Sequence, residues 1–172
     1  MQKFTYQVFK TLYRPKQMLI KDEYGETIFF LNRQSHKILA QILNAILRSG
    51  LPYTYSIAEP DGKAVYVIDC RFPGFRYLLV DHVSSESVKI VKSRVQLMET
   101  AYSFRLNEQD YYFDKDFAGT GHLKCNGKEI GAVSMSNRII NSKLDVIHVQ
   151  AIDKAAASLS AVLFHTFFYY NA

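Results

Sequence analysis

The chain has 172 residues, of which 48% are hydrophobic and 14% aromatic, and its formal net charge is +5. A chain of this length and composition is most simply one domain over residues 1–172, and its apolar content excludes an intrinsically disordered protein. The modest basic excess is compatible with an anionic membrane surface, with nucleic acid or with no charged partner, and the near balance of the two signs argues against a dedicated nucleic-acid-binding protein.

The cysteine content and the N-terminal segment indicate the cellular compartment in which the protein resides. Cys70 and Cys125 are too few for a disulfide framework, so we expect free, buried thiols in a reducing environment. The N-terminal segment MQKFTYQVFK has no long apolar run and no small-residue cleavage site, so no signal peptide is expected. Together these features predict a cytoplasmic protein.

Most of the chain consists of short segments in which apolar and polar residues alternate, which is typical of β-strands. Gly25, Gly62 and the pair Asn126-Gly127 mark tight turns, and Asn-Gly is the strongest short-range hairpin signal. We expect about twelve strands, at residues 4–9, 17–21, 27–31, 52–58, 64–70, 75–81, 88–97, 102–106, 111–114, 123–125, 129–134 and 144–150.

One amphipathic helix is predicted among the strands, at residues 36–48. Ser35 suits its N-cap, Ser49-Gly50 suits its end, and apolar residues recur at helical spacing between them. Two interpretations are open. The helix is a lid packed on the sheet or across a barrel end, or it forms a surface that meets a membrane or a partner.

The last apolar segment, residues 155–170, reads AAASLSAVLFHTFFYY and carries no formal charge when His165 is neutral. Apolar groups fall on every side of a helical wheel, so this helix is expected to be buried on all sides, with Asp153 as its N-cap. It would span roughly 24 Å, short of the roughly 30 Å hydrocarbon core of a membrane. We therefore expect the strands to wrap this helix and His165 to be a core histidine. A membrane anchor and a helix docked on a partner are the alternatives.

This pattern resembles the bacterial tubby C-terminal-like proteins, which group with the LURP-one-related and phospholipid scramblase-like folds. The resemblance is carried by YYFDKDF at 111–117, a glycine at 119 or 121, NGKEIG at 126–131, the strand 146–150 and the tail. It implies a mainly β (α+β) fold, an antiparallel barrel of about twelve strands enclosing the C-terminal helix. It also implies a binding role, because eukaryotic relatives bind phosphoinositides or act at membranes, although no lipid-binding motif of the family matches residue by residue.

Catalytic, cofactor and metal motifs are absent from the sequence. No histidine lies at zinc-ligand spacing from a cysteine, and Gly119-Thr120-Gly121 lacks the lysine and the helix of a phosphate-binding loop. Asp114 and Asp116 lie on the same side of a predicted strand, but the segment offers too few oxygen donors for a calcium loop. We therefore assign no catalytic residue, no metal ligand and no cofactor.

The remaining candidate site is basic and aromatic. Exposed aromatic side chains between arginines suit an anionic lipid interface, and the alternative is a hairpin whose phenylalanines pack inward. The residues proposed to contact lipid are Arg71, Phe72, Phe75, Arg76, Lys89, Lys92 and Arg94.

The leading hypothesis is a non-enzymatic binding module, peripheral to the membrane, that contacts anionic phospholipid or a membrane-proximal protein. One alternative is a protein-interaction or regulatory scaffold that uses the helix at 36–48. Another is an enzyme, which would require a deep polar pocket with converging histidine and carboxylate groups. No specific nucleic acid is expected as a partner.

Overall fold

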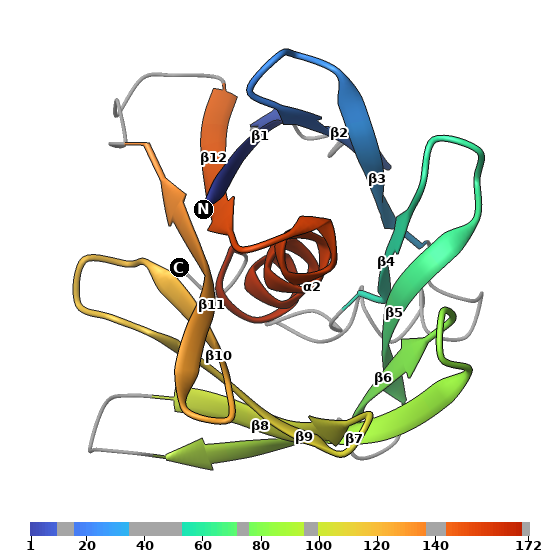
Figure 1. The fold of residues 1–172 in the computed structure, drawn as a ribbon, viewed down its shortest axis with the longest axis vertical. Coiled ribbons are helices and arrows are strands. Elements are labelled where there is room, and N and C mark those ends of the chain that lie inside the picture. Colours follow the sequence, from blue (N-terminus) through green and yellow to red (C-terminus); the bar gives the residue numbers. More distant parts are fainter. Residues whose placement is uncertain (10–15, 35–52, 72–75, 95–99, 137–143, 170–172) are drawn as a thin grey trace, which may run out of the picture.

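The computed structural model describes residues 1–9, 16–34, 53–71, 76–94, 100–136 and 144–169 of the chain. In these ranges every strand is antiparallel to its neighbours, and β1 pairs with β12 to close the sheet into a barrel (Figure 1). The strands are β1 (Gln2–Phe9), β2 (Gln17–Asp22), β3 (Thr27–Arg33), β4 (Tyr55–Ala58), β5 (Ala64–Arg71), β6 (Arg76–Asp81), β7 (Glu86–Arg94), β8 (Thr100–Leu106), β9 (Gln109–Lys115), β10 (Gly121–Cys125), β11 (Lys128–Met135) and β12 (Leu144–Ala151).

The predicted antiparallel barrel of about twelve strands is therefore confirmed. The strand bounds differ from the predicted ones by a few residues, as at β7, which was expected at 88–97. The amphipathic helix predicted at 36–48 lies outside the described residues, in the connection between β3 and β4, and stays a prediction.

Period-two alternation orients the side chains of the barrel wall. In β1, Phe4, Tyr6 and Val8 are buried while Gln7 and Phe9 are exposed, because successive side chains of a strand point to opposite faces. The same alternation along the other strands fills the interior with aliphatic and aromatic groups. The alternation of apolar and polar residues in the sequence thus indicates which side chains face the barrel axis.

Two-residue turns close several hairpins. Asn126 and Gly127 have φ values of 48° and 79°, as a type I′ turn requires, so the hairpin predicted there is confirmed. Asn107 and Glu108 also adopt positive φ, at 49° and 61°, although neither is a glycine. The Asn107 backbone N–H donates to Glu86 Oε2 at 2.8 Å, which ties this turn to the neighbouring β7.

The C-terminal segment runs through the centre of the barrel (Figure 1). Helix α2 (Lys154–Phe164) begins at the predicted N-cap, where Asp153 Oδ1 accepts a hydrogen bond of 2.7 Å from the Ala156 N–H. Every residue from Ala156 to Phe164 is buried, so the predicted burial of the tail by the strands is confirmed. No helix in the described ranges is both long and apolar enough to span a membrane.

The predicted C-terminal helix is confirmed through Tyr169, and its last part, His165–Tyr169, is a π-helical segment, η1. The wider turn accommodates ring packing: Phe167 stacks on Tyr102 with centroids 3.7 Å apart and meets the edge of Tyr77 at 4.7 Å. The tertiary contacts of these rings thus override the regular helical repeat.

The direction of this central segment distinguishes the two ends of the barrel. We call the end where α2 begins the helix-start end; it carries the turns β2–β3, β4–β5, β6–β7, β8–β9 and β10–β11. We call the opposite end, where η1 terminates, the helix-finish end. The Tyr169 hydroxyl marks it by donating to Asp145 Oδ2 at 2.9 Å, near the start of β12.

Gly131 in β11 allows α2 to approach the barrel wall closely. A Cβ at this position would clash with Ser160 Oγ but would lie 3.4 Å from Ser160 Cβ. Ser160 is fully buried, and its hydroxyl has no hydrogen-bond partner among the described residues. The obstacle to a side chain at residue 131 is therefore one unpaired hydroxyl.

We predict that Gly131→Ala destabilises the protein by about 1–3 kcal/mol, because the added methyl group overpacks this contact. Ser160→Ala alone is expected to be neutral or stabilising, since it removes a buried unpaired hydroxyl. In the double variant most of the loss should be recovered. Chemical denaturation of the four proteins measures this coupling, and a Gly131→Ala cost unchanged by Ser160→Ala would contradict the assigned contact.

Candidate functional site

Acidic residues predominate at one end of the barrel, and basic residues predominate at the other. We compared the terminal residues of the strands together with the described residues that connect them. At the helix-start end these positions carry Asp22, Glu23, Glu26, Glu59, Asp61, Asp81, Glu86, Glu108 and Asp153, against Lys63, Lys128 and Lys154. At the helix-finish end the described positions carry Lys16, Arg33, Arg71, Arg76, Arg94 and Lys115, against Asp116. The net charge of the described residues therefore changes sign from one end of the barrel to the other.

Two of the predicted lipid-contacting residues face each other across a hairpin at the helix-finish end. Arg71 ends β5, Arg76 begins β6, and the two are cross-strand partners. Phe72 and Phe75, which lie between them in sequence, are outside the described residues. Whether these phenylalanines face solvent or pack inward thus stays a prediction, while the backbone positions of both arginines are defined.

Strand β7 carries the other three residues of the predicted site, and they lie in two different places. Arg94 ends β7 at the helix-finish end, and the exposed Lys92 lies two positions before it. Lys89 is exposed on the outer wall instead, in a shallow groove of about 440 Å³ that Arg105 and Tyr112 also line. The structure gathers Arg71, Arg76, Lys92 and Arg94 on three neighbouring strands and leaves Lys89 away from the barrel end.

Three more basic residues, which the predicted lipid site did not include, lie at the same end: Lys16, Arg33 and Lys115. They lie at or beside the ends of strands far apart in sequence, so no local pattern indicates that they share one end of the barrel. Arg33 places its guanidinium carbon 4.7 Å from the centroid of the Tyr53 ring, and Lys115 Nζ lies 5.1 Å from that of Phe168. These aromatic contacts orient both cations at the end of the barrel.

An aromatic layer lies beneath this basic end. His165 is fully buried, with its ring stacked 4.7 Å from Tyr169 and in edge contact with Tyr55 at 4.9 Å. This confirms that His165 belongs to the core. Phe167 and Phe168 continue the layer toward Tyr102, so the described rings fill the end of the barrel interior.

The two candidate carboxylates, Asp114 and Asp116, contact different partners. Asp114 Oδ2 accepts from Lys124 Nζ at 3.3 Å, whereas Asp116 Oδ2 lies 3.2 Å from His122 Nε2. The other ring nitrogen, His122 Nδ1, is 3.0 Å from Glu129 Oε2. No group of three potential metal ligands occurs within the part of the chain that the structure describes.

His122 is held between two carboxylates, and this arrangement shifts its titration. Burial by itself lowers the pKa of His122, but the hydrogen bonds and charges of Asp116 and Glu129 outweigh burial and raise that pKa above its ordinary value. Burial favours a higher pKa for Asp116, but the Thr120 backbone N–H and His122 outweigh it and lower that pKa. The ion pair therefore joins β10 to β11 and to the turn that follows β9.

We predict a pH-dependent contribution of this ion pair to stability. A raised His122 pKa stabilises the fold fully below pH 6.5, and this contribution is lost as the pH rises through the folded-state pKa. A lowered Asp116 pKa stabilises above pH 3.8, and that contribution is lost as the pH falls through its folded-state pKa. His122→Gln should therefore lower Tm more at about pH 6 than at about pH 9.

His82→Gln serves as the control for this measurement, because His82 is an exposed turn residue. Thermal unfolding followed by circular dichroism provides the comparison. An equal loss of Tm at both pH values for His122→Gln would contradict the assigned ion pair.

Both cysteines are free, as predicted, but half-buried rather than buried, because each lies near the end of its strand. Burial and the neighbouring Asp69 carboxylate raise the pKa of Cys70 to about 11. Nucleophilic attack requires the thiolate. Cys70 is therefore protonated, and poorly reactive, at neutral pH.

We predict that iodoacetamide alkylates Cys70 about a hundredfold more slowly at pH 8 in the folded protein than in the unfolded chain. The reason is the smaller thiolate fraction that follows from the raised pKa. Peptide mass spectrometry separates Cys70 from Cys125 and measures both rates. Equal Cys70 rates in the folded and unfolded protein would show that the thiol is not shielded.

Comparison with known proteins agrees with this architecture. A family model described as the Tubby C-terminal like domain matches residues 4–170, and neither a search of curated proteins nor one of solved structures finds a match. The tubby-like fold is a lipid- or protein-binding barrel, which is compatible with a non-enzymatic binding role. The narrower relation to LURP-one-related and scramblase-like proteins stays a prediction. With its closed barrel, its buried C-terminal helix and this match, the chain belongs to the Tubby C-terminal like domain family.

Proposed function

We propose that the protein is a non-enzymatic binding module that docks on anionic phospholipid, peripheral to the membrane, through the helix-finish end of its barrel. The observation that carries this proposal is the separation of charge between the two ends. Each lysine or arginine close to an anionic membrane contributes about 1 kcal/mol of attraction. Several such residues at one end provide a binding energy that the opposite, acidic end does not.

The same separation supports one orientation on the membrane. An anionic surface attracts the helix-finish end and repels the carboxylates of the helix-start end, so the barrel axis is expected to stand upright on the membrane. Arg71, Arg76, Lys92 and Arg94 then approach the head groups together. Lys89 lies on the outer wall and is expected to contribute less.

Apolar contact with the membrane must come from a part of the chain other than the C-terminal helix. The interior of the barrel already buries α2 and most of η1. Phe72 and Phe75 follow directly on Arg71 and precede Arg76, so they connect the two strand ends at the basic end. Aromatic side chains next to cations suit the membrane interface.

Co-sedimentation with vesicles tests the proposal. The protein should bind phosphatidylcholine vesicles that contain phosphatidylserine, bind pure phosphatidylcholine weakly, and dissociate as salt increases. Arg71→Glu/Arg76→Glu should reduce the affinity about tenfold or more, because two attractive charges become repulsive.

The matched control is Lys63→Glu/Lys128→Glu, which makes the same change in net charge at the helix-start end. It should leave vesicle binding nearly unchanged. The proposal fails if the unmodified protein ignores anionic vesicles at low salt. It also fails if the control variant loses as much affinity as the arginine variant, because net charge and not the barrel end would then be responsible.

A further inference from the structure

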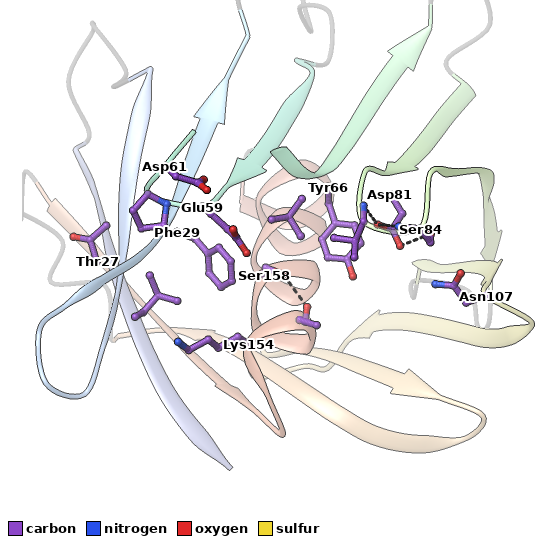
Figure 2. A pocket seen from close by; sticks show the side chains of 15 residues that line it. Thr27, Phe29, Glu59, Asp61, Tyr66, Asp81, Ser84, Asn107, Lys154 and Ser158 are labelled. Carbon is purple, nitrogen blue, oxygen red and sulfur yellow. Dashed lines mark hydrogen bonds between the residues drawn. The ribbon is translucent and has the colours of Figure 1, made fainter. Parts of the chain in front are cut away.

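A cavity of about 690 Å³ opens at the helix-start end, opposite the proposed lipid-binding end. It lies between the first turn of α2, the start of β3 and the turns β4–β5, β6–β7 and β8–β9. Figure 2 shows Glu59, Asp61 and Phe29 to the left of α2, with Tyr66 and Asp81 to its right. The volume falls within the range of roughly 300–1,000 Å³ that is usual for small-molecule sites.

The inner surface of this cavity is apolar and largely aromatic. Phe29, Val65 and Tyr66 contribute side chains that are only 5%, 6% and 7% exposed. Ile28, Pro60, Val83 and Ala155 complete the apolar lining. Such a surface accepts a hydrocarbon or aromatic body, because contact with these side chains removes apolar area from water.

The Tyr66 hydroxyl supplies a polar group within this apolar lining. The Tyr66 residue is 7% exposed, and its hydroxyl forms no hydrogen bond with the described residues. Burial, followed by the charges of Asp81, Tyr111 and Asp153, raises the pKa of Tyr66. The hydroxyl is therefore protonated, and its oxygen is free to accept a hydrogen bond from a ligand.

The charged residues around the cavity determine which ligand charge it favours. Glu59, Asp61 and Asp81 are its acidic lining residues, and Lys154 is its basic one. Asp81 is committed to the β6–β7 turn, where it accepts from the backbone N–H groups of Val83 and Ser84 and from the Ser84 hydroxyl. Glu59 and Asp61 are exposed, and no described cation pairs with either carboxylate.

An anion is disfavoured even though a helix begins here. Asp153 already occupies the N-terminus of α2, because its side chain accepts from the Ala156 N–H and its carbonyl accepts from the Ala157 N–H at 3.1 Å. The surplus of carboxylates over the single lysine adds repulsion for a second negative group.

We propose that this cavity binds a small organic cation, an ammonium group carried on an apolar alkyl or aromatic body. The body lies against Phe29, Val65 and Tyr66. The ammonium group lies near Glu59 and Asp61, where it gains charge attraction. Because this site and the vesicle-binding end lie at opposite ends of the barrel, each proposal is tested separately.

Three probes of equal chain length test the chemistry: hexylammonium, 1-hexanol and hexanoate. Isothermal titration calorimetry on the full chain should give affinity in the order hexylammonium, hexanol, hexanoate. The proposal fails if hexylammonium shows no binding up to about 10 mM. It also fails if hexanol or hexanoate binds as tightly, because the cavity would then be apolar without selecting a cation.

Variants locate the cation. Glu59→Gln/Asp61→Asn should weaken hexylammonium binding about tenfold while leaving hexanol binding unchanged. The matched control is Glu23→Gln/Glu26→Gln, which removes the same charge from exposed residues of the β2–β3 turn outside the lining. Equal weakening by the control and the Glu59/Asp61 variant would overturn the assigned site. So would unchanged binding in the Glu59/Asp61 variant.

Discussion

Burial of the C-terminal helical segment inside the barrel is the interaction on which the rest of the structure depends. A closed sheet of this size needs a filled interior, and a helix that is apolar on every side cannot face water. The inner faces of the strands and α2 therefore bury each other's apolar surface. Gly131 shows how close the two surfaces come, since even a methyl group there would meet Ser160. With its apolar tail buried, the protein must make surface contacts through charge and through connecting segments.

The direction in which this helix is threaded gives the barrel two different ends. At its beginning, Asp153 caps α2 and the surrounding turns carry carboxylates, beside a cavity with an aromatic lining. At its termination, the rings of η1 fill the interior, and the strand ends carry arginines and lysines. Opposite charge and different packing suit the two ends to different partners, an anionic surface at one and a small cation at the other. Neither proposal depends on the other, because the buried helix lies between the two sites.

The candidate sites show where sequence reasoning succeeds and where it stops. Arg71 and Arg76 flank one short hairpin, so their proximity is visible in the sequence and the register confirms it. Lys16, Arg33 and Lys115 join the same barrel end only because the sheet closes, and no local pattern indicates this. The cavity is assembled in the same way, from Phe29, Glu59 and Tyr66 on three strands or turns and from the first turn of α2. A site built by long-range pairing leaves no contiguous motif.

The strands, their hairpin turns and the buried tail could be predicted from the amino-acid sequence, because each rests on a local signal. These signals are alternation of period two, residues such as Asn126-Gly127 that tolerate positive φ, and a segment without charges. Only the tertiary structure decided the π-helical turn at His165–Tyr169, the separation of charge between the ends and the cavity beside α2. These features depend on which strands become neighbours when the barrel closes around the helix. That choice is set by the summed burial of many side chains distant in sequence, and no single segment encodes it.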